Sequence, residues 1–261
     1  MALSESVISD LAGVVDDAQR RAAEIVKLTE SQPGMDVADG YAVQAELARR
    51  WQAEGRRLTG YKGGLTSKAK MAQMGLETPV FGVLMGDTCV PDGDVVDMTQ
   101  LIHPKVEAEI AFVTSHELSG DVSIDEVLAS TEFVMPAIEV IDSRFKDFKF
   151  DIQSVIADNT SAARYVVGGS PRRPGGLDLR LLGVVMERNG EVVGTAAGAA
   201  VMGHPAASVV ALVKWLAEGG QALPAGSLVM TGGVTEAVAV HAGDHVTARV
   251  QHLGSVGVRF S

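Results

Sequence analysis

Two glutamates separated by one residue are the first feature of the sequence that could do chemistry. Glu107 and Glu109 lie in residues 103–112, where apolar side chains occupy the alternate positions. Successive side chains of a β-strand point to opposite faces, so this spacing places both carboxylates on one face. An edge strand with a solvated acidic face would show the same pattern, since charged residues usually face water. The pair alone therefore leaves two interpretations open.

A third glutamate favours a metal site. Glu139 lies in the apolar run 134–141, which is typical of a buried strand. A buried carboxylate is normally protonated, paired or bound to a metal, because desolvation of its charge is costly. Two carboxylates about 4 Å apart repel each other by about 4 kcal/mol even at an effective dielectric constant of about 20. If Glu107, Glu109 and Glu139 converge, we expect a divalent cation between them, and ligation by oxygen alone favours Mg²⁺ or Mn²⁺.

Lys62 is the candidate cation for the same cavity. It lies between a strand-like stretch and the pair Gly63 and Gly64, and glycines allow close approach of a ligand to the backbone. The segment is not a P-loop, because the order and spacing of that motif are absent. A surface lysine is an equally acceptable interpretation of this position.

Two further polar segments could contact a ligand. Asp158 and Asn159 follow an apolar stretch, and their side chains could equally form an ordinary turn. Thr231 and Gly232 end a predicted strand. They could form a turn, or a backbone wall against which a flat substrate lies.

The elements that must position these residues change in character at residue 58. Apolar residues at helical spacing follow Ser4, and a second helical pattern over residues 41–51 ends before Gly55. Beyond Leu58, short apolar runs are punctuated by glycine, which predicts strands and turns. We therefore expect an N-terminal helical region over residues 1–57 and a catalytic body over residues 58–261.

The second half of the chain predicts a sheet interrupted by one helix. Asn189 and Gly190 are typical of a type I′ hairpin turn. A helix is expected over residues 205–218, with Pro205 in its first turn and Gly219 at its end. The predicted fold class is α+β, with helices first and then a mixed, mainly antiparallel β body. The strand candidates are residues 106–113, 134–141, 182–187, 192–196, 228–231, 237–240, 246–251 and 256–260.

The composition excludes several partners. A net charge of −11 disfavours nucleic acid and anionic lipid surfaces, both of which are bound by clustered Lys and Arg. No stretch approaches the roughly 20 apolar residues of a membrane span, and the N-terminus lacks the features of a signal peptide. Cys89 is the only cysteine, so no intrachain disulfide can form, and we expect it to be buried as a small apolar residue. These features predict a cytoplasmic protein.

Together the motifs resemble the hydratase/decarboxylase family of aromatic meta-cleavage pathways, within the fumarylacetoacetase superfamily. The resemblance extends from about residue 37 to the C-terminus. The motifs that carry it are residues 60–69, 78–82, 103–109, 139–144, 157–159 and 254–260.

The resemblance implies a mixed β-roll of the fumarylacetoacetase C-terminal type, with Glu107, Glu109 and Glu139 as metal ligands and Lys62 as the active-site lysine. It implies a Mg²⁺- or Mn²⁺-dependent carbon–carbon lyase, a carboxy-lyase that converts 2-oxohex-3-enedioate to 2-oxopent-4-enoate and CO₂. The alternative activity is hydration of 2-hydroxypenta-2,4-dienoate (2-keto-4-pentenoate). A carbon–carbon bond hydrolase of acylpyruvates is a more distant alternative. A non-catalytic partner of a hydratase is a possibility from a different class, which the glutamates and Lys62 disfavour. The resemblance also implies a homo-oligomer that associates with the pentadienoate hydratase of the same pathway.

A substrate with two carboxylates needs a second cation near its far end, and Arg164 and Lys149 are the candidates. Both could equally be surface charges. Gly63 departs from the family, which usually has a branched apolar residue there, so we expect a looser segment around Lys62. Further substrate-binding positions are expected at Ser67, Asp87, Asp158, Arg164, Thr231 and Gly232.

Overall fold

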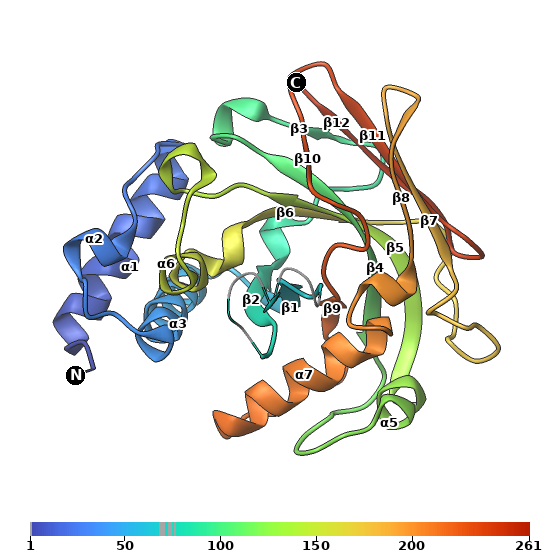
Figure 1. Cartoon of the computed structure of the whole chain (residues 1–261), viewed down its shortest axis with the longest axis horizontal. Helices are drawn as coiled ribbons and strands as arrows, with labels where there is room; N and C mark the ends of the chain where they lie inside the picture. The colour runs from blue at the N-terminus through green and yellow to red at the C-terminus, as the bar shows by residue number, and fades with distance from the viewer. Residues whose placement is uncertain (1, 68–70, 73–74, 76) are drawn as a thin grey trace.

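The N-terminal helices gather at one end of the molecule, on the left in Figure 1. The computed structural model describes residues 2–67, 71–72, 75 and 77–261. Ser4 caps the first helix by accepting a hydrogen bond from the Val7 N–H, and Asp36 caps the third in a capping box with Asp39. A helix from later in the chain, α6, joins this group. The bounds are α1 Glu5–Arg21, α2 Leu28–Ser31, α3 Val37–Ala53 and α6 Ile152–Ala157.

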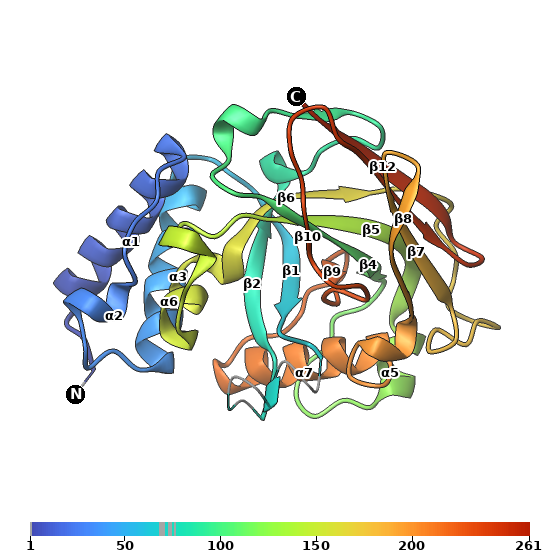
Figure 2. The same ribbon diagram turned by 45° about the horizontal axis from the view of Figure 1, so that its top comes forward.

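The larger sheet occupies the middle of the molecule (Figure 2). Its strand order is β2-β1-β9-β4-β5-β6, and β10 also pairs with β4. Among the described strands of this sheet, β1 and β9 are the pair that runs parallel, and the other pairs are antiparallel. The strands are β1 Leu58–Gly64, β2 Val80–Met85, β4 Lys105–Thr114, β5 Thr131–Ile141, β6 Ala162–Val167, β9 Leu228–Met230 and β10 Val238–Ala239.

A smaller sheet covers one side of the first, with strand order β3-β12-β11-β7-β8. The hairpin between β7 and β8 has positive φ at Asn189 (56°) and Gly190 (84°), which confirms the predicted type I′ turn. Mixed pairing in both sheets and helices at the start confirm the α+β prediction. The strands are β3 Val95–Val96, β7 Gly183–Arg188, β8 Glu191–Ala197, β11 His245–Val250 and β12 Gly254–Phe260.

Every strand predicted from the sequence is present, with its ends shifted by a few residues at most. Strands β1, β2, β3 and β6 were not predicted individually. Strands β1 and β2 contain glycine, β3 has two residues, and β6 directly follows a run of small polar residues. The remaining elements are helices α5 Ile124–Ala129 and α7 Pro205–Glu218 and the 3₁₀ turns η1 Gly86–Thr88, η2 Met98–Gln100, η3 Lys146–Phe148, η4 Asn159–Ser161 and η5 Gly198–Ala200.

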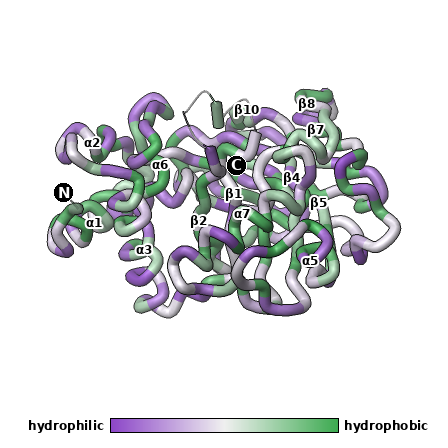
Figure 3. Tube along the Cα trace, turned by 60° about the horizontal axis from the view of Figure 1, so that its bottom comes forward, coloured by the Kyte–Doolittle hydropathy of each residue, from purple (hydrophilic) through white to green (hydrophobic). Residues whose placement is uncertain are grey.

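The apolar stripe of helix α7 belongs to the hydrophobic cluster that also contains residues of both sheets. The helix is labelled in Figure 3, where green marks apolar residues. With the residues before it, segment Gly198–Glu218 is long and apolar enough to cross a membrane, at a mean hydropathy of 1.4 over 18 residues. The prediction that no stretch approaches this limit was therefore too strict. Packing accounts for this composition, because core helices of globular proteins are also apolar. The stripe consists of Val209, Leu212, Val213 and Leu216.

A second apolar cluster joins the helical region to the β body. Val15 and Leu47 from the helices pack in one cluster with Met85 and Phe145 from the body. Gln44 of α3 donates hydrogen bonds of 2.9 Å to the carbonyls of Phe81 and Ile156. Strand β1 begins at Leu58, next to the predicted division at residue 57. Because the two parts share a core, that division stays a prediction.

Cys89 corrects one expectation. The sequence predicted a buried thiol, but Cys89 is exposed. It follows the 3₁₀ turn η1, which carries the chain out of β2 to the surface.

Candidate metal centre

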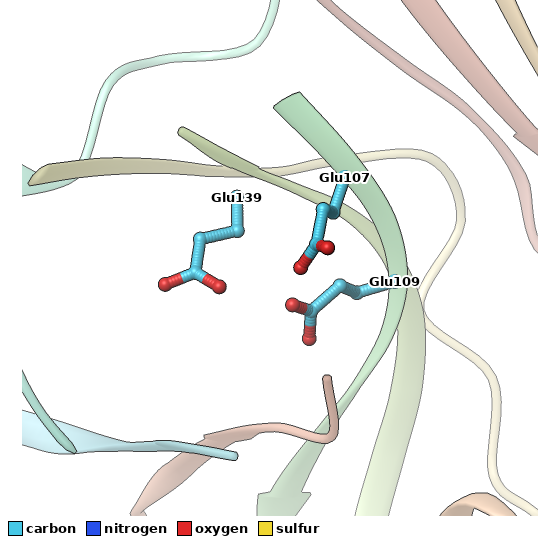
Figure 4. A group of neighbouring side chains, drawn as sticks. All are labelled: Glu107, Glu109 and Glu139. Atoms are coloured by element: carbon cyan, nitrogen blue, oxygen red, sulfur yellow. The ribbon is translucent and has the colours of Figure 1, made fainter. Parts of the chain in front are cut away.

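Strands β4 and β5 bring three carboxylates together. Their antiparallel register places Glu107 directly opposite Glu139, and Glu109 follows on the same face of β4. One carboxylate oxygen from each residue lies within 4.8 Å of the other two, and the side chains point toward one another in Figure 4. Strand β4 is flanked by β5 on one side and by β9 and β10 on the other, so the edge-strand interpretation is wrong.

The carboxylates are held in a strongly unfavourable setting for negative charge. Glu109 and Glu139 are 0% and 1% exposed. Burial, then repulsion from Glu139, raises the pKa of Glu109 well above its usual range. Burial also raises the pKa of Glu139, although Lys62 opposes this.

The donor atoms fit a hard divalent cation. Glu109 Oε1 and Glu139 Oε1 are buried and accept no hydrogen bond from the part of the chain that the structure describes. A cation between the carboxylates would satisfy these acceptors and remove their mutual repulsion. The set contains only carboxylate oxygens, which favours Mg²⁺ or Mn²⁺ over softer metals.

Lys62 projects from β1 into the same cluster. Its Nζ lies 3.0 Å from Glu139 Oε2 and donates a 3.2 Å hydrogen bond to the Thr160 carbonyl. Burial alone lowers the pKa of Lys62, whereas Glu139, Glu109 and Glu107 raise it, and the net pKa lies above the ordinary value. The side chain is only 3% exposed, so the surface-lysine interpretation is wrong.

The backbone after β9 closes one side of the cluster. The Gly232 N–H donates a 2.7 Å hydrogen bond to Glu109 Oε2, from a backbone with φ of +99° that favours glycine. A Cβ on Gly233 would lie 2.7 Å from the carboxyl carbon of Glu107. Thr231 hydrogen-bonds the Ile110 carbonyl at 2.8 Å. The segment thus forms a backbone wall beside Glu107 and Glu109, and contact of Thr231 and Gly232 with a substrate stays a prediction.

The turn that the sequence indicated at Asp158 and Asn159 continues through Ser161 and forms another wall. Asn159, Thr160 and Ser161 all have positive φ, at 49°, 51° and 61°. Asn159 pairs with β2, accepting from the Val83 N–H at 2.8 Å and donating to its carbonyl at 2.9 Å. Thr160 Oγ1 and Ser161 Oγ are buried without a partner among the described residues. Small polar residues directly after Asp158 in an apolar stretch were the only sequence signal.

A cavity of about 320 Å³ opens onto the cluster. Lys62, Lys105, Glu107, Phe148 and Ser161 are among its lining residues. A larger groove of about 580 Å³ between α3 and α7 is lined mainly by apolar side chains, and among the described residues it holds no metal-ligating cluster. The smaller cavity is therefore the candidate active site.

Residues 60–261 match the family model described as fumarylacetoacetate (FAA) hydrolase C-terminal. The chain is also 53% identical over 259 residues to 4-oxalocrotonate decarboxylase from Pseudomonas sp. (strain CF600), covering 99% of this chain and 98% of that protein. The chain belongs to the fumarylacetoacetate hydrolase family. A more distant relative is 2-keto-4-pentenoate hydratase from Paraburkholderia xenovorans (strain LB400), 39% identical over 90% of this chain and 88% of that protein.

A solved structure of the same family has nearly the same fold. It is 4-oxalocrotonate decarboxylase from Pseudomonas putida G7, complexed with magnesium and adipate. Its TM-score is 0.98 at 50% sequence identity, over 100% of this chain and 99% of that chain.

Arg164 and Asp87 lie outside the candidate site. Arg164 is paired with Val140 across β6 and β5, so it points to the face opposite Glu139. It donates to Gln100 Oε1 at 2.8 Å and, with Asp87, lines a separate polar pocket of about 360 Å³. Lys149 is 79% exposed and lies beside Asp147. The expectation that these residues contact the substrate of this cavity is therefore wrong.

Asp158 is buried beneath the turn that it precedes. Its carboxylate accepts hydrogen bonds from the backbone N–H and the Nε of Arg144. Burial raises the pKa of Asp158 to about 6, against the opposing effect of Arg144. The predicted substrate contact is thus replaced by a structural role, because Arg144 occupies the carboxylate.

The segment around Gly63 is tightly packed, which corrects the expectation of a looser one. A Cβ on Gly63 would lie 2.8 Å from Ser208 Oγ and 3.0 Å from Thr66 Cγ2. Ser208 and Thr66 therefore fill the space that a side chain here would take. Ser67 is half-buried and is not among the described lining residues of the cavity, and residues 68–70 lie outside the described part of the chain.

Proposed function

We propose that this member of the fumarylacetoacetate hydrolase family is a divalent-metal-dependent carboxy-lyase acting on 2-oxohex-3-enedioate. Its products would be CO₂ and 2-hydroxypenta-2,4-dienoate, the enol of 2-oxopent-4-enoate. The observation that carries the proposal is the convergence of three carboxylates and a buried lysine in one cavity of the chain. It is supported by 53% identity to a 4-oxalocrotonate decarboxylase over nearly the whole chain.

Glu107, Glu109 and Glu139 would hold Mg²⁺ or Mn²⁺. Such a cation would supply Lewis-acid chemistry, by stabilising negative charge that develops at the 2-oxo acid end of the substrate. The Gly232 N–H fixes the position of Glu109 through a 2.7 Å hydrogen bond. The buried walls around the carboxylates exclude water and strengthen these electrostatic interactions.

Decarboxylation breaks the bond between C5 and C6 of the substrate. The electron pair of that bond moves into the conjugated 3,4-alkene and 2-oxo group, and neutral CO₂ leaves. A proton on the resulting enolate completes the product. Each carbon and charge is thereby accounted for without an external oxidant or reductant.

Lys62 would serve as the proton donor and as a positive charge beside the reacting carbons. Against the effect of burial, which lowers its pKa, Glu139 favours the protonated form of Nζ. Glu139 Oε2 and the Thr160 carbonyl hold the ammonium group in place, at 3.0 and 3.2 Å.

The test supplies the protein and Mg²⁺ with 2-oxohex-3-enedioate and measures the release of CO₂. A parallel reaction supplies 2-hydroxypenta-2,4-dienoate and measures 4-hydroxy-2-oxopentanoate. We expect CO₂ without hydration. Rapid hydration with no CO₂ would instead establish the hydratase activity named for the relative that is 39% identical.

We further propose that the protein acts in the cytoplasm as a homo-oligomer that associates with the pentadienoate hydratase of the same pathway. The net charge of −11 and the single cysteine are compatible with that location. Size-exclusion chromatography with light scattering should give a mass above one chain, and addition of the hydratase should give a larger species. A monomer that does not bind the hydratase would contradict this assembly.

A further inference from the structure

Strand β4 places a second cation in the cavity, farther from the carboxylates than Lys62. Lys105 precedes Glu107 by two residues, so alternation puts both side chains on the same face. Both line the candidate cavity. Two residues of a strand span about 7 Å, roughly the length of an extended six-carbon chain. Positions 105 and 107 of the strand are therefore separated by about the length of such a chain.

An aromatic ring positions the ammonium group of Lys105. Its Nζ lies 4.1 Å from the centroid of the Phe148 ring, a cation–π geometry that orients the side chain. The His103 ring lies against the same phenylalanine, at 5.0 Å between centroids. Phe148 also lines the cavity, so the ring and the cation form one wall of it.

The N-terminal region holds this wall in place. Glu24 Oε1 accepts a 3.1 Å hydrogen bond from the Asp147 N–H, directly before Phe148. The same oxygen lies 3.2 Å from His103 Nδ1. The Glu24 carboxylate, from outside the β body, therefore contacts both His103 and the residue directly before Phe148.

The charge of Lys105 is not neutralised by the protein. Among residues 2–67, 71–72, 75 and 77–261, no carboxylate lies within 4.0 Å of its Nζ. Lys62 differs, since it is engaged by Glu139. The other candidates for a distal cation are elsewhere, with Arg164 on the opposite face and Lys149 beside Asp147. Within the described part of the chain, Lys105 is therefore a cation of this cavity that no carboxylate engages.

We infer that Lys105 binds the distal carboxylate of a dicarboxylate substrate whose 2-oxo acid end lies at the three glutamates. The inference rests on the proposed function and names the residue that selects a dianion over a monoanion. As the C5–C6 bond breaks, negative charge leaves the distal carboxylate and moves toward the 2-oxo oxygen. The Lys105 contact therefore stabilises bound substrate more than the transition state, and it acts in binding and specificity.

The test compares Lys105→Met with the unaltered protein, both saturated with Mg²⁺. Isothermal titration calorimetry measures the Kd of adipate, which has a distal carboxylate, and of oxalate, which occupies only the metal-binding end. We expect adipate to bind about tenfold to a hundredfold more weakly to the variant, as for loss of a charge-assisted hydrogen bond, and oxalate affinity to change less than about twofold. Lys105→Arg should keep most of the adipate affinity, and Lys149→Met serves as the matched lysine control.

Steady-state kinetics gives a second readout. Lys105→Met should raise KM for the dicarboxylate by about tenfold without lowering kcat, because the lost contact stabilises bound substrate more than the transition state. Equal weakening of adipate and oxalate, unchanged adipate binding, or no Mg²⁺-dependent adipate binding to the unaltered protein would overturn the inference. A fall in kcat at constant KM would overturn it as well. Failure of the proposed function is distinguishable, since it would abolish CO₂ release while the two Kd values still report on Lys105.

Discussion

Two buried groups of charges lie on either side of the turn at residues 158–161, and they differ in how well they are satisfied. In the first, all three guanidinium nitrogens of Arg144 donate hydrogen bonds, to Asp158 and to the carbonyls of Asp142, Asp158 and Ala162. In the second, the described residues bring together three carboxylates and the ammonium group of Lys62. Buried oxygens of Glu109 and Glu139 there accept no hydrogen bond from the described residues.

The difference separates a structural ion pair from a ligand site. A buried pair with every donor engaged is balanced in charge and holds the chain in one conformation. A buried cluster with excess negative charge and unused acceptors is destabilising until a cation enters. Both groups contain a strictly buried Asp or Glu, so burial alone does not distinguish them. The two groups are distinguished by whether each buried polar atom has a hydrogen-bond or ion-pair partner.

Loss of one carboxylate from the glutamate cluster should have the largest effect on activity. Glu109→Gln should lower Mg²⁺-dependent turnover by at least about a hundredfold, since charge stabilisation by a metal is worth several kcal/mol and 1.4 kcal/mol is tenfold. The apo variant should be no less stable than the unaltered chain, because one repelling charge is gone. Turnover and urea unfolding measure the two effects, and Glu132→Gln in β5 is the control. Full turnover in Glu109→Gln would remove the distinction between the two groups.

Breaking the ion pair should act on stability instead. Arg144→Met leaves the Asp158 carboxylate buried without its partner, which should lower the free energy of unfolding by about 3–5 kcal/mol. Urea denaturation measures this loss. The control is Arg180→Met, which breaks an exposed pair with Asp178 and should cost less than about 1 kcal/mol. Adding Asp158→Asn to Arg144→Met should recover part of the loss, and an absence of recovery would argue against the unpaired charge as its cause.

The stabilising effect of Mg²⁺ should grow with pH. Folding raises the pKa of Glu109 and Glu139, so the folded apo protein binds more protons than the unfolded chain above pH 4.5, and its stability falls as pH rises. The cation competes with those protons, so it binds best where the carboxylates are ionised. With Mg²⁺ at a hundred times the Kd that it has at high pH, we expect the free energy of unfolding to rise by about 3 kcal/mol at high pH. At the same Mg²⁺ concentration the increase should be smaller at lower pH. Tm measured with and without Mg²⁺ across this range tests the trend, and an increment independent of pH would contradict it.

The smallest expected effect concerns the packing that positions Lys62. In Gly63→Ala the new Cβ would meet Ser208 Oγ and Thr66, which should lower the free energy of unfolding by about 1–3 kcal/mol and reduce kcat by displacing Lys62. Adding Ser208→Ala to Gly63→Ala removes the closest contact. The double variant should therefore recover part of the lost free energy of unfolding and part of the lost kcat. Unfolding and kcat are measured on the single and double variants. Unchanged values for Gly63→Ala would support the looser segment expected from the sequence.

Local patterns predicted much of the fold. Helix α7 begins and ends where Pro205 and Gly219 indicated, and the β7–β8 turn forms at Asn189 and Gly190. These features depend on backbone preferences of neighbouring residues, which a sequence shows directly. Strand β1 was not predicted as a separate element, since its glycines lack the usual strand propensity and its pairing with β2 and β9 is what stabilises it.

The sequence by itself determined the chemical types at the site. Alternation along β4 put Glu107 and Glu109 on one face, and the apolar surroundings of Glu139 indicated a buried acid. Only the tertiary structure decided which charges share a cavity. It paired Asp158 with Arg144, turned Arg164 to the opposite face of the sheet and placed Lys105 over Phe148. The physical reason is that register and packing bring distant residues together, and whether a buried charge is balanced depends on neighbours from other strands.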